Sequence, residues 1–128
     1  WYGVYQPRTR QLSFGFAGHP PAFLVHEHAQ PEPLLKTRGL PIGLMPNASY
    51  ETQTVAVPRG ARFYLSSDGA YEVQRTDGDT MTFAALVEFM STPSTESESD
   101  LDRLSPYLTS LHGHEGLDDD FSILRIDF

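Results

Sequence analysis

The stretch Ser66-Ser67-Asp68-Gly69-Ala70-Tyr71-Glu72 follows directly on an apolar run, Ala61-Arg62-Phe63-Tyr64-Leu65. The run predicts a strand, and Asp68 then places a carboxylate at the turn where this strand ends. Far along the chain, Asp118-Asp119-Asp120 precedes a second strand-like run over residues 121–126. If the two strands are neighbours, both acidic segments meet at one end of a sheet. Divalent metal sites with oxygen ligands are commonly built from carboxylates placed in this way.

Each acidic segment also has a simpler interpretation. An isolated Asp-Gly pair usually forms a turn, as we expect for Asp77-Gly78, and three adjacent carboxylates usually form a solvated loop. Two observations favour a metal site instead. Residues 70–73 indicate the start of a helix rather than a returning strand, and residues 118–120 directly precede a run with the character of a buried strand.

The first half of the chain indicates β structure. Aromatic and β-branched residues cluster in short runs bounded by Pro and Gly, which is typical of strands joined by turns. Strands are predicted over residues 2–6, 11–17, 22–25, 52–57 and 61–66. Two hairpins are predicted, closed by Pro7-Arg8-Thr9-Arg10 and by Pro58-Arg59-Gly60. Residues 32–50, rich in Pro and Gly, predict a loop with at most one short strand.

The second half of the chain predicts two helices. The first has apolar residues at helical spacing, namely Phe83, Leu86, Val87 and Met90, and Thr82 is its expected N-cap. Residues 92–100 are rich in Ser, Thr and Glu and predict a solvated loop. The second helix is defined by four leucines, Leu101, Leu104, Leu108 and Leu111. Pro106 either kinks this helix or restarts it with Ser105 as N-cap, and Gly113 is the expected stop.

Length and charge limit the possible functions. With 128 residues, the chain is expected to fold as a single domain over residues 1–128 around one core. Its formal net charge is -8, from 17 acidic and 9 basic residues, which disfavours binding to nucleic acid or to anionic membranes. A protein, a metal ion or a small molecule is therefore the expected partner.

Cysteine is absent, so disulfides and thiolate metal sites are excluded. The absence of cysteine is compatible with the reducing interior of a cell, and we expect a cytoplasmic location. No apolar run approaches the ~20 residues needed to span a bilayer. The chain starts in strand-like residues without the basic-then-apolar pattern of a signal peptide, so we expect further residues to precede it.

Five motifs occur in order along the chain. They are Ala17-Gly18-His19-Pro20-Pro21, Gly39-Leu40-Pro41-Ile42-Gly43, Pro58-Arg59-Gly60, Ser67-Asp68-Gly69-Ala70-Tyr71-Glu72 and Asp119-Asp120-Phe121-Ser122-Ile123-Leu124. In this combination the chain resembles the metal-dependent protein phosphatases of type 2C. More narrowly, it resembles the bacterial branch that regulates sigma factors through partner switching and sporulation.

The resemblance implies an α+β fold, with two antiparallel β-sheets packed as a sandwich and flanked by helices. It also implies a centre of two manganese or magnesium ions, whose bound water performs the chemistry without a further catalytic residue. Asp68 and Asp119 match the family's metal ligands. The implied supporting residues are Gly69, Glu72, Asp120 and His19. For Glu72 two roles stay open, orienting the ligand loop or capping a helix N-terminus, and His19 matches a structural turn.

One departure from the family pattern limits the comparison. The family carries an early Gly-Asp-x-x-Asp motif that supplies a bridging carboxylate, and this motif is absent here. Either the chain is the C-terminal portion of a longer phosphatase domain, or it is a member that has lost catalysis. The start in mid-strand favours the first interpretation. By analogy with relatives, a receiver or sensor module is expected ahead of the phosphatase domain.

The resemblance predicts a serine/threonine protein phosphatase in bacterial signalling. Its expected substrate is a phosphorylated regulatory protein, such as an anti-sigma factor antagonist. One alternative is a catalytically inactive module that binds such a protein. Another is a cupin-like barrel with metal bound by His26-Glu27-His28 or His112-Gly113-His114-Glu115. The two predicted helices and the Pro-rich loop argue against an all-β barrel.

Overall fold

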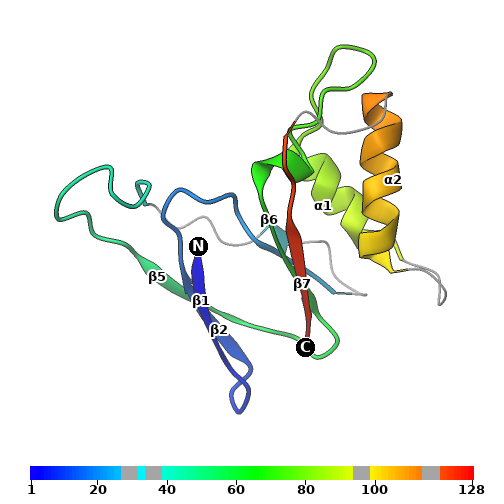
Figure 1. Ribbon diagram of the computed structural model, residues 1–128. Coiled ribbons are helices and arrows are strands. Elements are labelled where there is room, and N and C mark those ends of the chain that lie inside the picture. The colour runs from blue at the N-terminus through cyan, green and yellow to red at the C-terminus, as the bar shows by residue number, and fades with distance from the viewer. Residues whose placement is uncertain (27–31, 34–38, 94–98, 114–118) are drawn as a thin grey trace. The chain divides into compact units, whose positions relative to one another are not determined.

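The computed structural model describes residues 1–26, 32–33, 39–93, 99–113 and 119–128. The chain forms two compact units (Figure 1). The first unit comprises Trp1–Leu65 with Ile126–Phe128, and the second comprises Ser66–Arg125. None of the helices among the described residues is long and apolar enough to cross a membrane.

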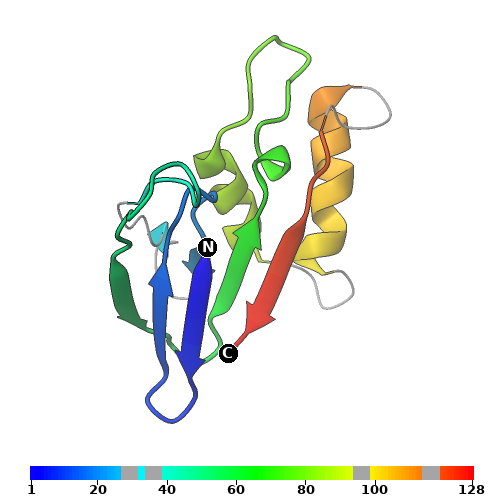
Figure 2. The same cartoon turned by 60° about the vertical axis from the view of Figure 1, so that its left-hand side comes forward.

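Within the described residues, seven strands form two antiparallel sheets. The three-stranded sheet has the order β1-β2-β5, with β1 at Tyr2–Gln6, β2 at Gln11–Gly15 and β5 at Thr52–Ala56. The other sheet has the order β4-β3-β6-β7, with β4 at Glu32–Pro33, β3 at Phe23–Val25, β6 at Arg62–Ser66 and β7 at Ile123–Asp127. Figure 2 shows the tight β1–β2 hairpin, whose register pairs Gln6 with Gln11. The predicted turn at residues 7–10 is confirmed.

The apolar core of the first unit is built from both sheets. Its buried residues are Leu12, Phe14, Ala22, Leu24, Val57, Ala61 and Phe63. Trp1 joins the two layers, because its ring stacks on Phe14 at 6.0 Å and meets Phe63 at 5.2 Å between centroids. Burying each large apolar side chain contributes roughly 1.5–3 kcal/mol. The predicted packing of two antiparallel sheets is therefore confirmed in this unit.

The predicted hairpin at residues 58–60 is wrong, because β5 and β6 belong to different sheets. The backbone of this connection is bound to other segments. The Val57 N–H donates to the Arg10 carbonyl at 2.8 Å, and the Arg10 guanidinium donates to the carbonyls of Val57 and Pro58 at 3.0 and 2.6 Å. The Gly60 N–H donates to the Phe128 carbonyl at 2.7 Å. These bonds carry the chain from one sheet to the other.

The second unit contains both helices. Helix α1 spans Phe83–Ser91, and the predicted cap is confirmed, since the Thr82 hydroxyl accepts the Ala85 N–H at 3.2 Å. The α1 ring of Phe89 stacks on Tyr107 of the second helix, with centroids 4.1 Å apart. The two helices therefore contact each other through a stacked pair of aromatic side chains.

Helix α2 spans Asp100–His112 and continues through Pro106, so the predicted restart at Ser105 is wrong. Proline removes one backbone hydrogen bond, but the fully buried side chains of Leu104 and Leu108 hold this helix from both sides of Pro106. The predicted stop is confirmed, because Gly113 ends the helix in the left-handed conformation, at φ 82°.

Candidate metal centre

Asp68 lies where β6 ends and a 3₁₀ turn, Asp68–Ala70, begins. The Asp68 carbonyl accepts the N–H groups of Tyr71 and Glu72 at 2.9 and 2.8 Å, and its carboxylate accepts the Gly69 N–H at 3.1 Å. The carboxylate is exposed. The predicted helix start at residues 70–73 is only this short turn, since the Val73 carbonyl instead accepts the Met81 N–H at 2.9 Å.

Asp119 and Asp120 lie just before β7, and both are exposed. The Asp119 carboxylate accepts the Asp120 N–H at 2.8 Å, which orients the Asp119 side chain over its own backbone. Asp118, the first residue of the predicted acidic run, lies outside the described residues.

Two hydrogen bonds join the acidic segments. The Ser67 N–H donates to the Ser122 carbonyl at 3.0 Å, and the Ser122 N–H donates to the Ser67 hydroxyl at 2.9 Å. These bonds lie at the ends of β6 and β7, which are neighbours in the sheet. The prediction that the two segments meet at adjacent strand ends is confirmed. Metal ligation by Asp68 and Asp119 stays a prediction.

Gly69 allows this close approach. A Cβ atom at position 69 would lie 2.6 Å from the Asp120 carbonyl oxygen and 3.2 Å from its carbon. Both are backbone atoms, which cannot move aside as a flexible side chain can. The absence of a side chain at Gly69 therefore sets the separation between the Asp68 turn and the Asp119–Asp120 segment.

Replacing Gly69 by alanine is expected to lower the free energy of unfolding by about 1–3 kcal/mol, because the new methyl group forces the two segments apart. Urea denaturation measures this change. Gly15→Ala is the matched control, since its Cβ would meet only the Glu51 carbonyl at 3.4 Å. We expect that control to unfold within about 1 kcal/mol of the parent. Equal stability of both variants would contradict the role of this contact.

Tyr71 lies beside the acidic turn. Burial raises the pKa of its hydroxyl, and the charges of Glu72 and Asp68 raise it further. Its ring meets Phe83 edge-on at 5.4 Å between centroids. A tyrosine hydroxyl is already protonated at neutral pH, and the raised pKa extends this state to higher pH, so Tyr71 can donate a hydrogen bond next to the carboxylates.

Comparison with known proteins identifies the family. The profile of the family described as Stage II sporulation protein E (SpoIIE) matches residues 1–128. The chain belongs to the SpoIIE family. No curated protein gives a significant sequence match.

Solved structures share the fold of this SpoIIE-family chain. The PP2C phosphatase domain of SpoIIE from Bacillus subtilis, with a fragment of its regulatory domain, superposes with a TM-score of 0.77 at 16% identity, over 96% of this chain and 36% of that one. The RsbU and RsbW domains of Rv1364c from Mycobacterium tuberculosis superpose with a TM-score of 0.65 at 23% identity, over 96% of this chain and 34% of that one. RsbX in complex with magnesium superposes with a TM-score of 0.61 at 17% identity, over 97% of this chain and 53% of that one. The chain thus spans about a third to a half of these chains. The α+β fold of its described residues, with two antiparallel sheets and two helices, matches part of the PP2C phosphatase fold.

Two further predicted site residues of the SpoIIE-family chain are Glu72 and His19. The Glu72 side chain is exposed, and because no helix begins at residue 70, its proposed role as a helix cap is wrong. His19 belongs to the first unit, and its Nδ1 lies 2.9 Å from the Pro20 carbonyl. That contact agrees with the structural turn implied by the resemblance.

The histidine pairs weighed for a cupin-like barrel are only partly described. His112 is buried in α2, and its Nδ1 lies 3.0 Å from the Gln74 carbonyl. Glu27, His28, His114 and Glu115 lie outside the described residues. The two helices and the SpoIIE-family fold exclude the barrel interpretation.

The carboxylate oxygens at the strand ends supply part of the ligand set that a hard cation requires. Asp68 and Asp119 offer exposed carboxylate oxygens, which Mg²⁺ and Mn²⁺ prefer. Within the described ranges, no group of three or more His, Cys, Asp or Glu side chains is placed to hold a metal. These two carboxylates therefore supply part of a coordination shell, to which backbone oxygens and water can add.

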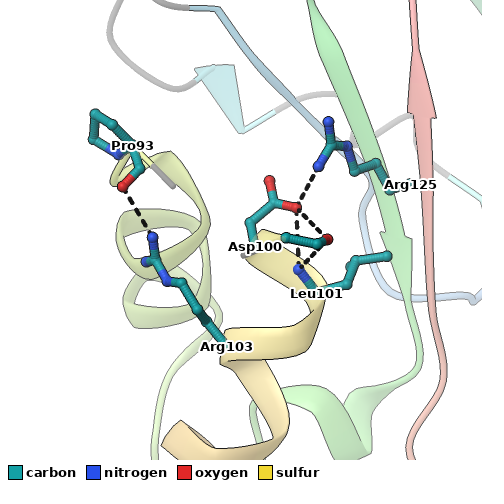
Figure 3. A network of polar contacts seen from close by, with 6 residues as sticks. Pro93, Asp100, Leu101, Arg103 and Arg125 are labelled. Atoms are coloured by element: carbon teal, nitrogen blue, oxygen red, sulfur yellow. Dashed lines mark hydrogen bonds and ion pairs between the residues drawn. The ribbon is translucent and has the colours of Figure 1, made fainter. Parts of the chain in front are cut away.

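Asp100 is a charged residue that the sequence analysis placed in a solvated loop. It is instead fully buried at the start of α2. Figure 3 shows its carboxylate accepting the Arg125 guanidinium at 2.6 Å and the Leu101 N–H at 3.0 Å. The available signal was Ser99 followed by an acidic first turn, which is typical of a helix N-terminus. Its ion-pair partner on β7 could not be identified from the sequence.

Proposed function

We propose that this chain is part of a metal-dependent serine/threonine protein phosphatase. The observation that carries the proposal is the pair of hydrogen bonds between Ser67 and Ser122, which brings the Asp68 turn to the Asp119 segment. Membership of the SpoIIE family, and the fold shared with PP2C phosphatase domains, support the same activity.

The proposed cofactor is Mn²⁺ or Mg²⁺. RsbX was solved in complex with magnesium, and the SpoIIE phosphatase domain was also solved after soaking with manganese. Asp68 and Asp119 are the residues of this chain that would hold such ions. When bound, a pair of ions lowers the pKa of water and stabilises charge during displacement at phosphorus.

Other residues support these carboxylates. Gly69 sets the backbone separation of the two segments, and the Asp119 carboxylate is oriented by the Asp120 N–H. Tyr71 is neutral at neutral pH, as tyrosine ordinarily is, and burial and the nearby charges raise the pKa of its hydroxyl further. A neutral donor beside the carboxylates can hydrogen-bond a phosphate oxygen without adding negative charge to the site.

The proposed substrate is a phosphoserine or phosphothreonine on a cytoplasmic regulatory protein of the anti-sigma factor antagonist type. An RsbU domain occurs with an RsbW domain in the Mycobacterium tuberculosis relative, which supports a place in such signalling. The net charge of -8 also favours a protein partner over nucleic acid or an anionic membrane. A receiver or sensor domain in the same natural protein would provide the regulatory input.

The test is release of phosphate from a phosphoserine peptide by the full natural protein that contains these residues. We expect turnover with Mn²⁺ or Mg²⁺ that stops when EDTA removes the ion. Circular dichroism confirms that the protein stays folded in each condition. A folded protein that releases no phosphate with either metal would contradict the proposal and favour a phosphatase-like module that only binds its partner.

A further inference from the structure

Residues 39–50, here termed the 39–50 loop, expose an unusual set of apolar side chains. Ile42, Leu44 and Met45 are 79%, 63% and 57% exposed. The loop contains no charged residue. Soluble proteins rarely leave clustered apolar side chains in water unless they form an interaction site.

Contacts within the first unit hold this loop in place. Gly39 packs directly on the Phe16 carbonyl, and a Cβ atom at Gly18 would lie 2.7 Å from the Pro41 ring. The Leu44 N–H donates to the Pro41 carbonyl at 3.2 Å, which closes a turn. A surface that is ordered before binding loses less conformational entropy when a partner arrives.

Ile42 forms one wall of a groove at the end of the three-stranded sheet. The groove has a volume of about 270 Å³ and is lined mainly by apolar and aromatic residues, among them Trp1, Tyr2, Phe16, Ile42 and Tyr50. Small-molecule sites usually have roughly 300–1,000 Å³. This groove lies at the lower limit of that range, and its aromatic walls are typical of sites that anchor a side chain of another polypeptide.

Charge decides between possible occupants. Glu51 also lines the groove and is exposed, so it places a carboxylate beside the apolar surface. The net charge of -8 repels a second copy of this chain. A segment with a basic residue next to its apolar side chain matches both the groove and Glu51.

We propose that the 39–50 loop and its groove form a docking surface for a protein segment in which an apolar side chain neighbours Lys or Arg. The apolar side chain enters the groove beside Ile42, and the cation faces Glu51. That this segment belongs to the phosphatase's protein substrate rests on the proposed function. The docking itself does not depend on phosphate chemistry.

The test is binding of the full natural protein to an array of short unphosphorylated peptides with systematically varied positions. We expect selection of Leu, Ile, Met or Phe next to Lys or Arg. Ile42→Ser is expected to lower the binding affinity for the selected peptides about tenfold. Glu51→Gln is expected to remove the preference for the basic neighbour and to retain the apolar one. Val4→Ser is the matched control, because Val4 is 42% exposed in the first unit but does not line the groove.

Three results on binding and self-association would overturn the proposal. They are an array without apolar selection, selection that Ile42→Ser leaves unchanged, and a concentration-dependent dimer that Ile42→Ser abolishes. A large fall in melting temperature for Ile42→Ser would likewise overturn it, since part of the natural protein would then cover the loop. If the protein selects peptides but has no phosphatase activity, only the proposed function is contradicted. If it has phosphatase activity but selects no peptides, only the docking surface is contradicted.

Discussion

Replacing Asp68 by asparagine is expected to lower metal-dependent phosphate release by more than about a hundredfold while the fold stays intact. Loss of a residue that merely orients a metal ligand typically costs 10–100-fold in affinity or activity, so loss of a proposed ligand is expected to cost more. The Asp68 carboxylate is exposed, and an asparagine oxygen can keep the hydrogen bond that it accepts from the Gly69 N–H. The measurements are steady-state phosphate release and the Kd for Mn²⁺ from calorimetry, with the full natural protein.

Asp77→Asn is the matched control for that experiment. Asp77 is also exposed and also precedes glycine in a turn, where its carboxylate accepts the Asp79 N–H at 3.1 Å. We expect this variant to keep both activity and Mn²⁺ affinity. Asp119→Asn is expected to behave like Asp68→Asn, because the two residues lie in the segments joined by Ser67 and Ser122. Full activity in either of the two ligand variants would remove that residue from the proposed metal centre.

Replacing Arg125 by methionine is expected to lower the free energy of unfolding by about 3–5 kcal/mol, because the fully buried Asp100 carboxylate then loses its cation. The Arg125 side chain is only 25% exposed, so water cannot fully replace it. Urea denaturation at neutral pH measures the effect.

Two further variants separate the lost ion pair from lost packing. Asp100→Asn combined with Arg125→Met removes the buried charge together with its Arg125 partner, so we expect the double variant to recover much of the stability. Arg103→Met is the single-site control. Arg103 donates to the Pro93 carbonyl at 2.9 Å (Figure 3). Its guanidinium carbon lies 5.1 Å from the Phe89 ring centroid, and Arg103 is partly exposed. We expect Arg103→Met to lower the free energy of unfolding by about 1 kcal/mol or less. An equally small cost for Arg125→Met would show that the buried pair is unimportant for stability.

Local patterns predicted most of the secondary structure. The helical spacing from Phe83 to Met90 and the Thr82 cap depend on residues close in sequence, and the structure confirms both. The strands at residues 2–6, 11–15 and 62–66 were likewise predictable from their composition. The sequence left open whether Pro106 kinks or restarts α2, and one continuous helix forms because the packing of Leu104 and Leu108 outweighs the hydrogen bond that proline removes.

The sequence by itself determined the positions of most strands, of both helices and of the two acidic segments, because periodicity, capping and turn residues act over a few neighbours, whereas the α+β class came from the resemblance to a family. Only the tertiary structure decided that β5 and β6 enter different sheets, that Asp100 is buried against Arg125, and that Gly69 meets the Asp120 carbonyl. Each of these depends on contacts between residues far apart in the chain. Such contacts are selected by the packing of the whole core, where burial and the pairing of buried polar groups outweigh local preference.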